Sequence, residues 1–288
     1  MEAIRRKKRS QWQDVFRRFK KNKLAVVGFI MLLLLFIVAI LSIFFVNYDD
    51  VVAQNVRNKL APWSLEHLLG TDTFGRDILS RLLYASRFSI TIGFAVVIVS
   101  MSAGTIIGAV AGFYGKLVGN VLMRITDMFI AIPVHLFAIA VVAVLGPGII
   151  NLTIAISLAN ISGYARLMRS AVLGVKEMDY IEAARASGAG NLRILWKHII
   201  PATLAPMIVQ ATLGIGFAII CASALSYLGL GILPPNPEWG AMLAEGQPVI
   251  SISPNLVLVA GFAIMYVVLA FNLVGDGLRE ALDPKMKN

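Results

Sequence analysis

This sequence has little charge and almost no cysteine. Lys, Arg, Asp and Glu make up 15% of its 288 residues, whereas about a quarter is usual for a soluble domain. Cys221 is the only cysteine, which excludes an intramolecular disulfide and the metal motifs built from cysteine pairs. Hydrophobic residues make up 58% of the chain. This composition excludes a soluble α/β enzyme, a disordered chain and a disulfide scaffold, and it leaves a polytopic membrane protein.

The six longest apolar stretches of the chain contain no Asp, Glu, Lys or Arg. They are 24–46, 88–113, 128–145, 149–165, 201–225 and 256–274. About 20 apolar residues in a helix cross the hydrocarbon core of a bilayer. The stretch 149–165 is the shortest and contains Asn151, Asn160 and Ser162, so neighbouring helices must shelter it. Because none of the stretches alternates apolar and polar residues as barrel strands do, we expect an all-α integral membrane protein with six transmembrane helices.

The distribution of Lys and Arg predicts the orientation of these spans. With the N-terminus inside, only five of the 26 basic residues fall in outer loops, all between Arg57 and Arg87. Since basic residues remain on the cytoplasmic side of short loops, both termini should be cytoplasmic. The basic head and the 23-residue stretch after it predict an uncleaved anchor rather than a secretory signal. We expect the head to contact membrane lipid and no nucleic acid.

This topology divides the chain into five parts. We expect a basic cytoplasmic N-terminal segment at 1–23, a first transmembrane anchor at 24–46, an extracytoplasmic loop at 47–87, a core with five spans at 88–275 and a cytoplasmic tail at 276–288. A cytoplasmic loop at 176–201 interrupts the core.

The sequence contains no recognisable energy-supplying or catalytic motif. It has no G-x-x-x-x-G-K-[ST] and no H-E-x-x-H, and no stretch contains the acidic or basic residue that ion-coupled carriers usually need. His67, His135 and His198 fall on an outer loop, a span and an inner loop, so they cannot share one site. We therefore expect a non-catalytic protein that uses no metal and no cofactor. A self-sufficient secondary carrier is the alternative, followed by an intramembrane hydrolase.

The inner loop between the fourth and fifth stretches has the pattern of two short helices. Asp179 followed by Glu182 has the spacing of a capping box and predicts that a helix starts just after Asp179. Gly188 is placed to end that helix in the left-handed conformation. Asn191 is expected to cap a second helix, which runs to Pro201. Such a pair is either an ordinary surface hairpin or a projection that fits a groove on another protein.

Part of this loop resembles the EAA loop of binding-protein-dependent ABC importer permeases. The residues that carry the match are Glu182, Ala183, Ala184, Gly188 and Pro201. The resemblance implies that this loop couples the permease to cytoplasmic ABC ATPase subunits.

A second motif indicates which family of these permeases the chain resembles. The residues Gly70, Asp72, Gly75, Arg76, Asp77 and Arg81 lie in a segment similar to the G-T-D-x-x-G-R-D-x-x-S-R signature of the dipeptide/oligopeptide/nickel permease family. The resemblance covers residues 12 to 285. It implies a type I ABC importer permease fold in a bacterial inner membrane, with 88–275 as the permease core. It also implies import of dipeptides, oligopeptides or a solute such as a nickel chelate, with a second homologous permease and an extracytoplasmic substrate-binding protein as partners.

Small residues recur on one face of the second stretch. Gly104, Gly108 and Gly112 are spaced every fourth residue, which lets helix backbones approach closely. The helix that packs against them lies either in this chain or in the second permease.

Uncharged polar residues inside the spans are candidates for lining a translocation path. Asn151, Gln210 and Ser223 are such residues. They either let a polar solute pass without holding it or form hydrogen bonds between helices.

Overall fold

The computed structural model describes residues 11–282, and its secondary structure in that range consists of helices and one isolated bridge. Residues 1–10 of the predicted basic segment and residues 283–288 of the predicted tail lie outside the described residues. The long helices are α1 (Gln11–Lys21), α2 (Lys23–Phe45), α4 (Ile78–Tyr114), α5 (Lys116–Ile130), α6 (Val134–Leu145), α7 (Ile149–Val175), α10 (Ile200–Tyr227) and α12 (Asn255–Leu282). The short ones are α3 (Tyr48–Val52), α8 (Asp179–Ala186), α9 (Asn191–Ile194), α11 (Trp239–Gly246), the π-helix Leu195–Ile199 and the 3-10 turns Val56–Asn58 and Gln247–Val249.

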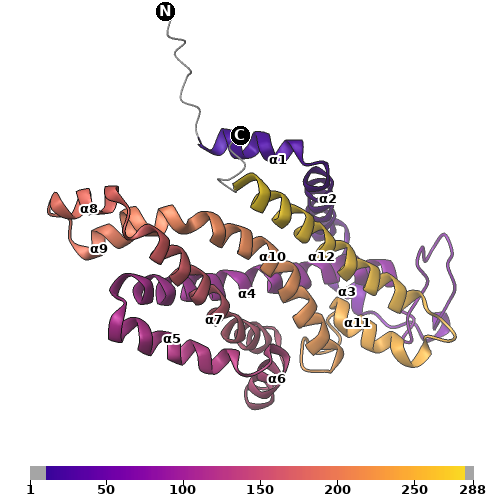
Figure 1. The fold of residues 1–288 in the computed structure, drawn as a ribbon. Coiled ribbons are helices and arrows are strands. Elements are labelled where there is room, and N and C mark those ends of the chain that lie inside the picture. The colour runs from indigo at the N-terminus through magenta and orange to yellow at the C-terminus, as the bar shows by residue number, and fades with distance from the viewer. Residues whose placement is uncertain (1–10, 283–288) are drawn as a thin grey trace, which may run out of the picture.

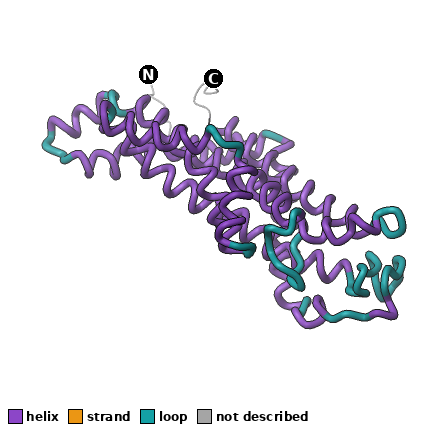
Figure 2. Tube along the Cα trace, turned by 90° about the horizontal axis from the view of Figure 1, so that it is seen from below, coloured by secondary structure: helices purple, strands orange, loops and turns teal. Residues whose placement is uncertain are grey.

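The helices form one elongated bundle around α4. Along its length α4 packs against α7 and α10, while α12 packs against both α10 and α2 (Figure 1). The helix α1 lies beside the C-terminal end of α12, where Nδ2 of Asn22 donates to Oε2 of Glu280 at 2.5 Å. The α8/α9 pair projects at one end of the bundle, and the loop before α4 lies with α11 at the other (Figures 1 and 2).

The prediction of a helical membrane protein is confirmed, but four helices rather than six have the length and composition to span a bilayer within residues 11–282. These are α2, α4, the continuous helix Asn191–Tyr227 and α12. The expected span at 128–145 is wrong as a single helix, because α5 and α6 meet at 87° and count as a fifth span only together. Pro133 precedes α6 and has no N–H to continue the helical hydrogen bonds, which explains the break.

The helix α7 is long enough to cross a bilayer, with 27 residues, but it is not among the four. Asn151 and Asn160 lower its hydropathy, as the sequence suggested. Most of its apolar side chains are shielded by α4, α6 and α10, so this polar helix is sheltered by its neighbours.

Two helix boundaries differ from those expected. The helix α4 begins at Ile78, ten residues before the apolar stretch, because Oδ1 of Asp77 caps it by accepting from the backbone N–H of Ser80 at 2.8 Å. The second helix of the inner loop does not end at Pro201 but continues into α10. A π turn before Pro201 places the proline in the first turn of α10, where its missing N–H costs little.

Candidate functional site

The hairpin formed by α8 and α9 carries the predicted coupling residues on its surface. Glu182, Ala183 and Gly188 are exposed, whereas Ile181 of the same helix is completely buried. Gly188 has φ +80°, so the prediction of a left-handed helix end is confirmed. The backbone N–H of Ala189 then donates to the carbonyl of Ala184 at 3.1 Å, which closes the helix end.

The predicted caps of this hairpin are wrong. Met178 is the N-cap residue of α8 and Gly190 that of α9, so Asp179 and Asn191 are each the first residue of a helix. In the first turn of α8 the negative charge of the Asp179 carboxylate still interacts favourably with the positive end of the helix dipole, although it makes no capping hydrogen bond.

Four charged side chains meet in the interior at the opposite end of the bundle. Nε of Arg76 lies 2.6 Å from Oδ2 of Asp72, and Nη2 of Arg76 lies 2.7 Å from Oε2 of Glu245. Arg81 also contacts both carboxylates, through Nη2 to Oε1 of Glu245 at 3.1 Å and through Nη1 to Asp72. Asp72 and Arg81 have no exposed side-chain surface. Two guanidinium groups therefore neutralise two carboxylates in a buried network.

The remaining signature residues shape the loop around this network. Gly70 and Gly75 have φ values of +78° and +75°, and a Cβ on Gly75 would lie 1.8 Å from the carbonyl oxygen of Asn55. Oδ2 of Asp77 lies 3.0 Å from Nδ1 of His67, while its other oxygen caps α4. The predicted signature residues are thus brought together, and in this chain they hold one loop to α4 and α11. We call residues 47–81 with α11 the loop assembly.

A further buried carboxylate, Glu238, ties the start of α11 to two long helices. Its Oε2 accepts from the backbone N–H groups of Gly240 and Ala241 at 2.8 and 3.1 Å. Its Oε1 accepts from the hydroxyls of Ser89 on α4 and Ser223 on α10 at 3.1 and 3.2 Å. Ser223 is therefore engaged in contacts between helices.

The glycine stripe of α4 faces α7 of this same chain. A Cβ at Gly108 would lie 2.2 Å from the carbonyl oxygen of Ala165, and one at Gly112 would lie 2.8 Å from Cβ of Val172. Gly104 faces the same helix. The helix that packs against the stripe is therefore α7 of this chain and not a helix of a second permease. The approach is this close because glycine has no side chain.

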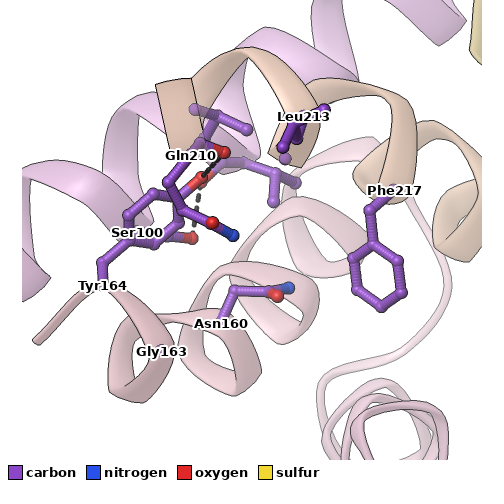
Figure 3. Close-up of a pocket in the computed structure, with 10 residues that line it drawn as sticks. Ser100, Asn160, Gly163, Tyr164, Gln210, Leu213 and Phe217 are labelled. Atoms are coloured by element: carbon purple, nitrogen blue, oxygen red, sulfur yellow. Dashed lines mark hydrogen bonds between the residues drawn. The ribbon is translucent and has the colours of Figure 1, made fainter. Parts of the chain in front are cut away.

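A cavity of about 260 Å³ lies among α4, α7 and α10. Its polar lining residues are Ser100, Asn160, Tyr164 and Gln210, and no charged residue of the described range 11–282 lines it (Figure 3). Of the three candidate path residues, Gln210 lines this cavity. Asn151 lies elsewhere, at the end of α6, where its Nδ2 donates to the carbonyls of Leu145 and Gly146 at 2.8 and 3.1 Å.

Sequence reasoning missed Glu238, Glu245 and Tyr164. The available signal for the two carboxylates was that they lie in a segment, 229–253, that contains no Lys or Arg, so their cations had to come from another part of the chain. Tyr164 gives no such signal, because a tyrosine in a span is common. Within residues 11–282 no group of three or more His, Cys, Asp or Glu side chains lies close enough to hold a metal ion.

Residues 104–288 match the family described as the inner membrane component of binding-protein-dependent transport systems. Residues 10–62 match the N-terminal transmembrane domain of oligopeptide transport permease C. The inner-membrane-component match includes the hairpin, and the N-terminal match ends inside the loop assembly.

Curated relatives are similar over nearly the whole chain. The dipeptide transport system permease protein DppC of Alkalihalophilus pseudofirmus is 47% identical, over 97% of this chain and 91% of that protein. The glutathione transport system permease protein GsiD of Pectobacterium atrosepticum is 42% identical, over 97% and 93%.

Among solved structures, the inward-facing methionine ABC transporter MetNI includes a chain of similar fold. Its TM-score is 0.58 at 16% identity, over 72% of this chain and 98% of that one. This likeness supports the fold, while the sequence matches establish the relationship. The chain belongs to the family of inner-membrane components of binding-protein-dependent transport systems.

Proposed function

We propose that this chain is one of two permeases that together form the path of an ABC importer for dipeptides or glutathione-type peptides. As a member of its family it is a non-catalytic, multi-pass inner-membrane subunit of an ABC transporter, which includes an ATPase and a binding protein. The observation that carries the choice of substrate is the match over 97% of the chain to permeases named for dipeptide and glutathione transport. The uncharged cavity supports it, because neutral groups let a zwitterion pass without holding it.

The proposed topology has six spans with both termini in the cytoplasm. The bent pair α5–α6 and the sheltered helix α7 would add two spans to the four apolar ones. The helix α1, at the N-terminal end, contacts α12, at the C-terminal end. Both ends on one side of the membrane agree with an even number of crossings. The basic residues of α1 would then face the anionic lipid headgroups of the cytoplasmic leaflet.

A second permease would complete the path. Gln210 borders the cavity and is itself exposed, so one side of the path is open in this chain. Apolar residues are also exposed along α5, among them Leu117, Val121 and Met128. They would face lipid or the second permease.

The hairpin would bind the ATPase. Its exposed residues Glu182, Ala183 and Gly188 form a projecting tip with little side-chain bulk, which suits a groove on another protein. Closure of the ATPases would move the hairpin, and α7 and α10, which flank it, would transmit that movement to the cavity. The loop assembly would lie outside the membrane, beneath the binding protein.

Uptake by a reconstituted complex tests the proposed function. The chain is placed in liposomes with its second permease and ATPase, the binding protein is added outside, and labelled L-alanyl-L-alanine or glutathione is supplied. We expect uptake that requires internal ATP and is insensitive to an ionophore. Uptake by this chain alone, or collapse of uptake with an ionophore, would instead establish the secondary carrier.

The double variant Glu182→Lys with Gly188→Pro tests the coupling role of the hairpin. We expect normal membrane insertion but uptake at least tenfold lower per ATP hydrolysed, because the charge and shape of the tip change while the buried Ile181 is kept. Asp14→Lys on α1 is the matched charge reversal and should keep normal coupling. Normal uptake by the double variant would refute the assignment.

A further inference from the structure

The cavity among α4, α7 and α10 has two carboxamide side chains with unused hydrogen-bonding capacity. Asn160 donates one N–H to the carbonyl of Ile156 at 2.8 Å, which leaves its Oδ1 and its second N–H. The Gln210 side-chain amide has no hydrogen-bond partner among residues 11–282; only its backbone carbonyl accepts, from the hydroxyl of Tyr164 at 3.5 Å. Figure 3 shows both amides in the same space between α7 and α10.

The other walls of the cavity are apolar or lack a side chain. Val97 and Leu213 line it from α4 and α10, and the ring of Phe217 borders it. A Cβ added at Gly163 would meet nothing within 4 Å, so this glycine leaves open space in the cavity. Apolar walls accept side chains of differing shape without selecting among them.

A carboxamide offers one acceptor and donor groups in a plane, which is the complement of a peptide bond. Being neutral, it binds a peptide bond weakly, and it does not attract either charged terminus of a peptide. Each cargo that the proposed function assigns to this chain contains an amide of this kind.

We propose that Asn160 and Gln210 form a transient subsite for the peptide bond of the cargo, midway along α7 and α10. The subsite recognises the amide and leaves side chains to the apolar walls. This inference rests on the proposed function and adds to it the chemical group that the path recognises.

The test compares a dipeptide with its ester analogue in the complete reconstituted complex. L-Alanyl-L-alanine and the analogue with an ester oxygen in place of the peptide N–H are supplied at equal occupancy of the binding protein, measured separately. We expect the wild-type complex to transport the ester about 3- to 10-fold more slowly, since one neutral hydrogen bond is lost. Gln210→Met and Asn160→Leu should slow the dipeptide to a similar rate and bring the ratio close to one.

Two further variants keep this test decisive. Gln13→Met changes an exposed glutamine on α1, outside the cavity, and should retain the wild-type ratio. Gly163→Val adds an apolar side chain to the cavity lining at a position where its Cβ meets nothing within 4 Å, and it should slow bulky dipeptides more than L-alanyl-L-alanine. Wild-type ratios in both carboxamide variants, or equal slowing of all dipeptides by Gly163→Val, would overturn the subsite. A wild-type complex that transports no peptide at all would instead refute the proposed function.

Discussion

The two ends of this molecule are stabilised in opposite ways. In the loop assembly, Asp72 and Arg81 are completely buried and find their partners within the chain. In the hairpin, the charged residue Glu182 is exposed and Ile181 supplies the buried anchor. A buried network of charges tolerates little change, whereas an exposed tip tolerates substitution unless something binds there. The loop assembly thus satisfies its charges within the chain, and the exposed hairpin agrees with the proposed role as a surface for a partner.

The largest effect is expected in the loop assembly, from Arg81→Met. Removing the guanidinium leaves Arg76 alone with two carboxylates, and breaking a buried pair of this kind costs about 3–5 kcal/mol. Thermal unfolding of the purified complex in detergent measures this loss. Arg57→Met, at an exposed arginine of the same loop, is the control and should change little. An unchanged unfolding temperature for Arg81→Met would show that the buried charge network does not stabilise the loop assembly.

An intermediate effect is expected where the two ends are joined. The helix α4 starts in the loop assembly, α7 ends beside the hairpin, and Gly108 lies where they touch. Gly108→Leu would force α4 and α7 apart and should cost about 3 kcal/mol, enough to prevent assembly of the complex.

Co-purification of the tagged chain with its partner subunits measures this effect. Gly174→Leu on α7, where an added Cβ meets nothing within 4 Å, should assemble normally. Full assembly of Gly108→Leu would show that the two ends do not depend on this contact.

The smallest effect is expected in the hairpin, from Gly188→Ala. Its φ of +80° is unfavourable for alanine by about 1 kcal/mol, but the added Cβ meets no neighbour. Gly190→Ala is the matched control, because this glycine has φ −68° and equally open surroundings. Uptake per ATP and unfolding temperature are measured for both. A loss of stability as large as that of Arg81→Met would contradict the view that the hairpin is exposed and locally stabilised.

Local chemistry made several features predictable. The left-handed end at Gly188 follows from glycine's freedom at positive φ after a run of helix-forming residues. The polar character of α7 could be read from Asn151 and Asn160. The helix start at Ile78 was missed because the first turns of α4 include charged and polar residues, so the apolar stretch begins later. Asp77 therefore caps the helix well before that stretch.

The break at Pro133 and the continuous helix through Pro201 show how position changes the effect of one residue type. Pro133 interrupts the expected span at 128–145, whereas Pro201 follows a π turn and lies in a first helical turn. The sequence around each proline is apolar, so the local pattern does not distinguish the two. The π turn that lets the chain continue through Pro201 is visible only in the structure.

The sequence by itself determined that this protein is helical, lies in a membrane and belongs to a family of transport subunits, because hydrophobic length and motif spacing are properties of neighbouring residues. Only the tertiary structure decided that Arg81 pairs with Glu245, 164 positions away, and that Asn160 and Gln210 share one cavity. Such pairings depend on which helix faces meet. An arginine's local sequence does not specify which distant carboxylate will neutralise it. The partner is the carboxylate that the folded bundle buries beside it, because a buried charge needs a partner.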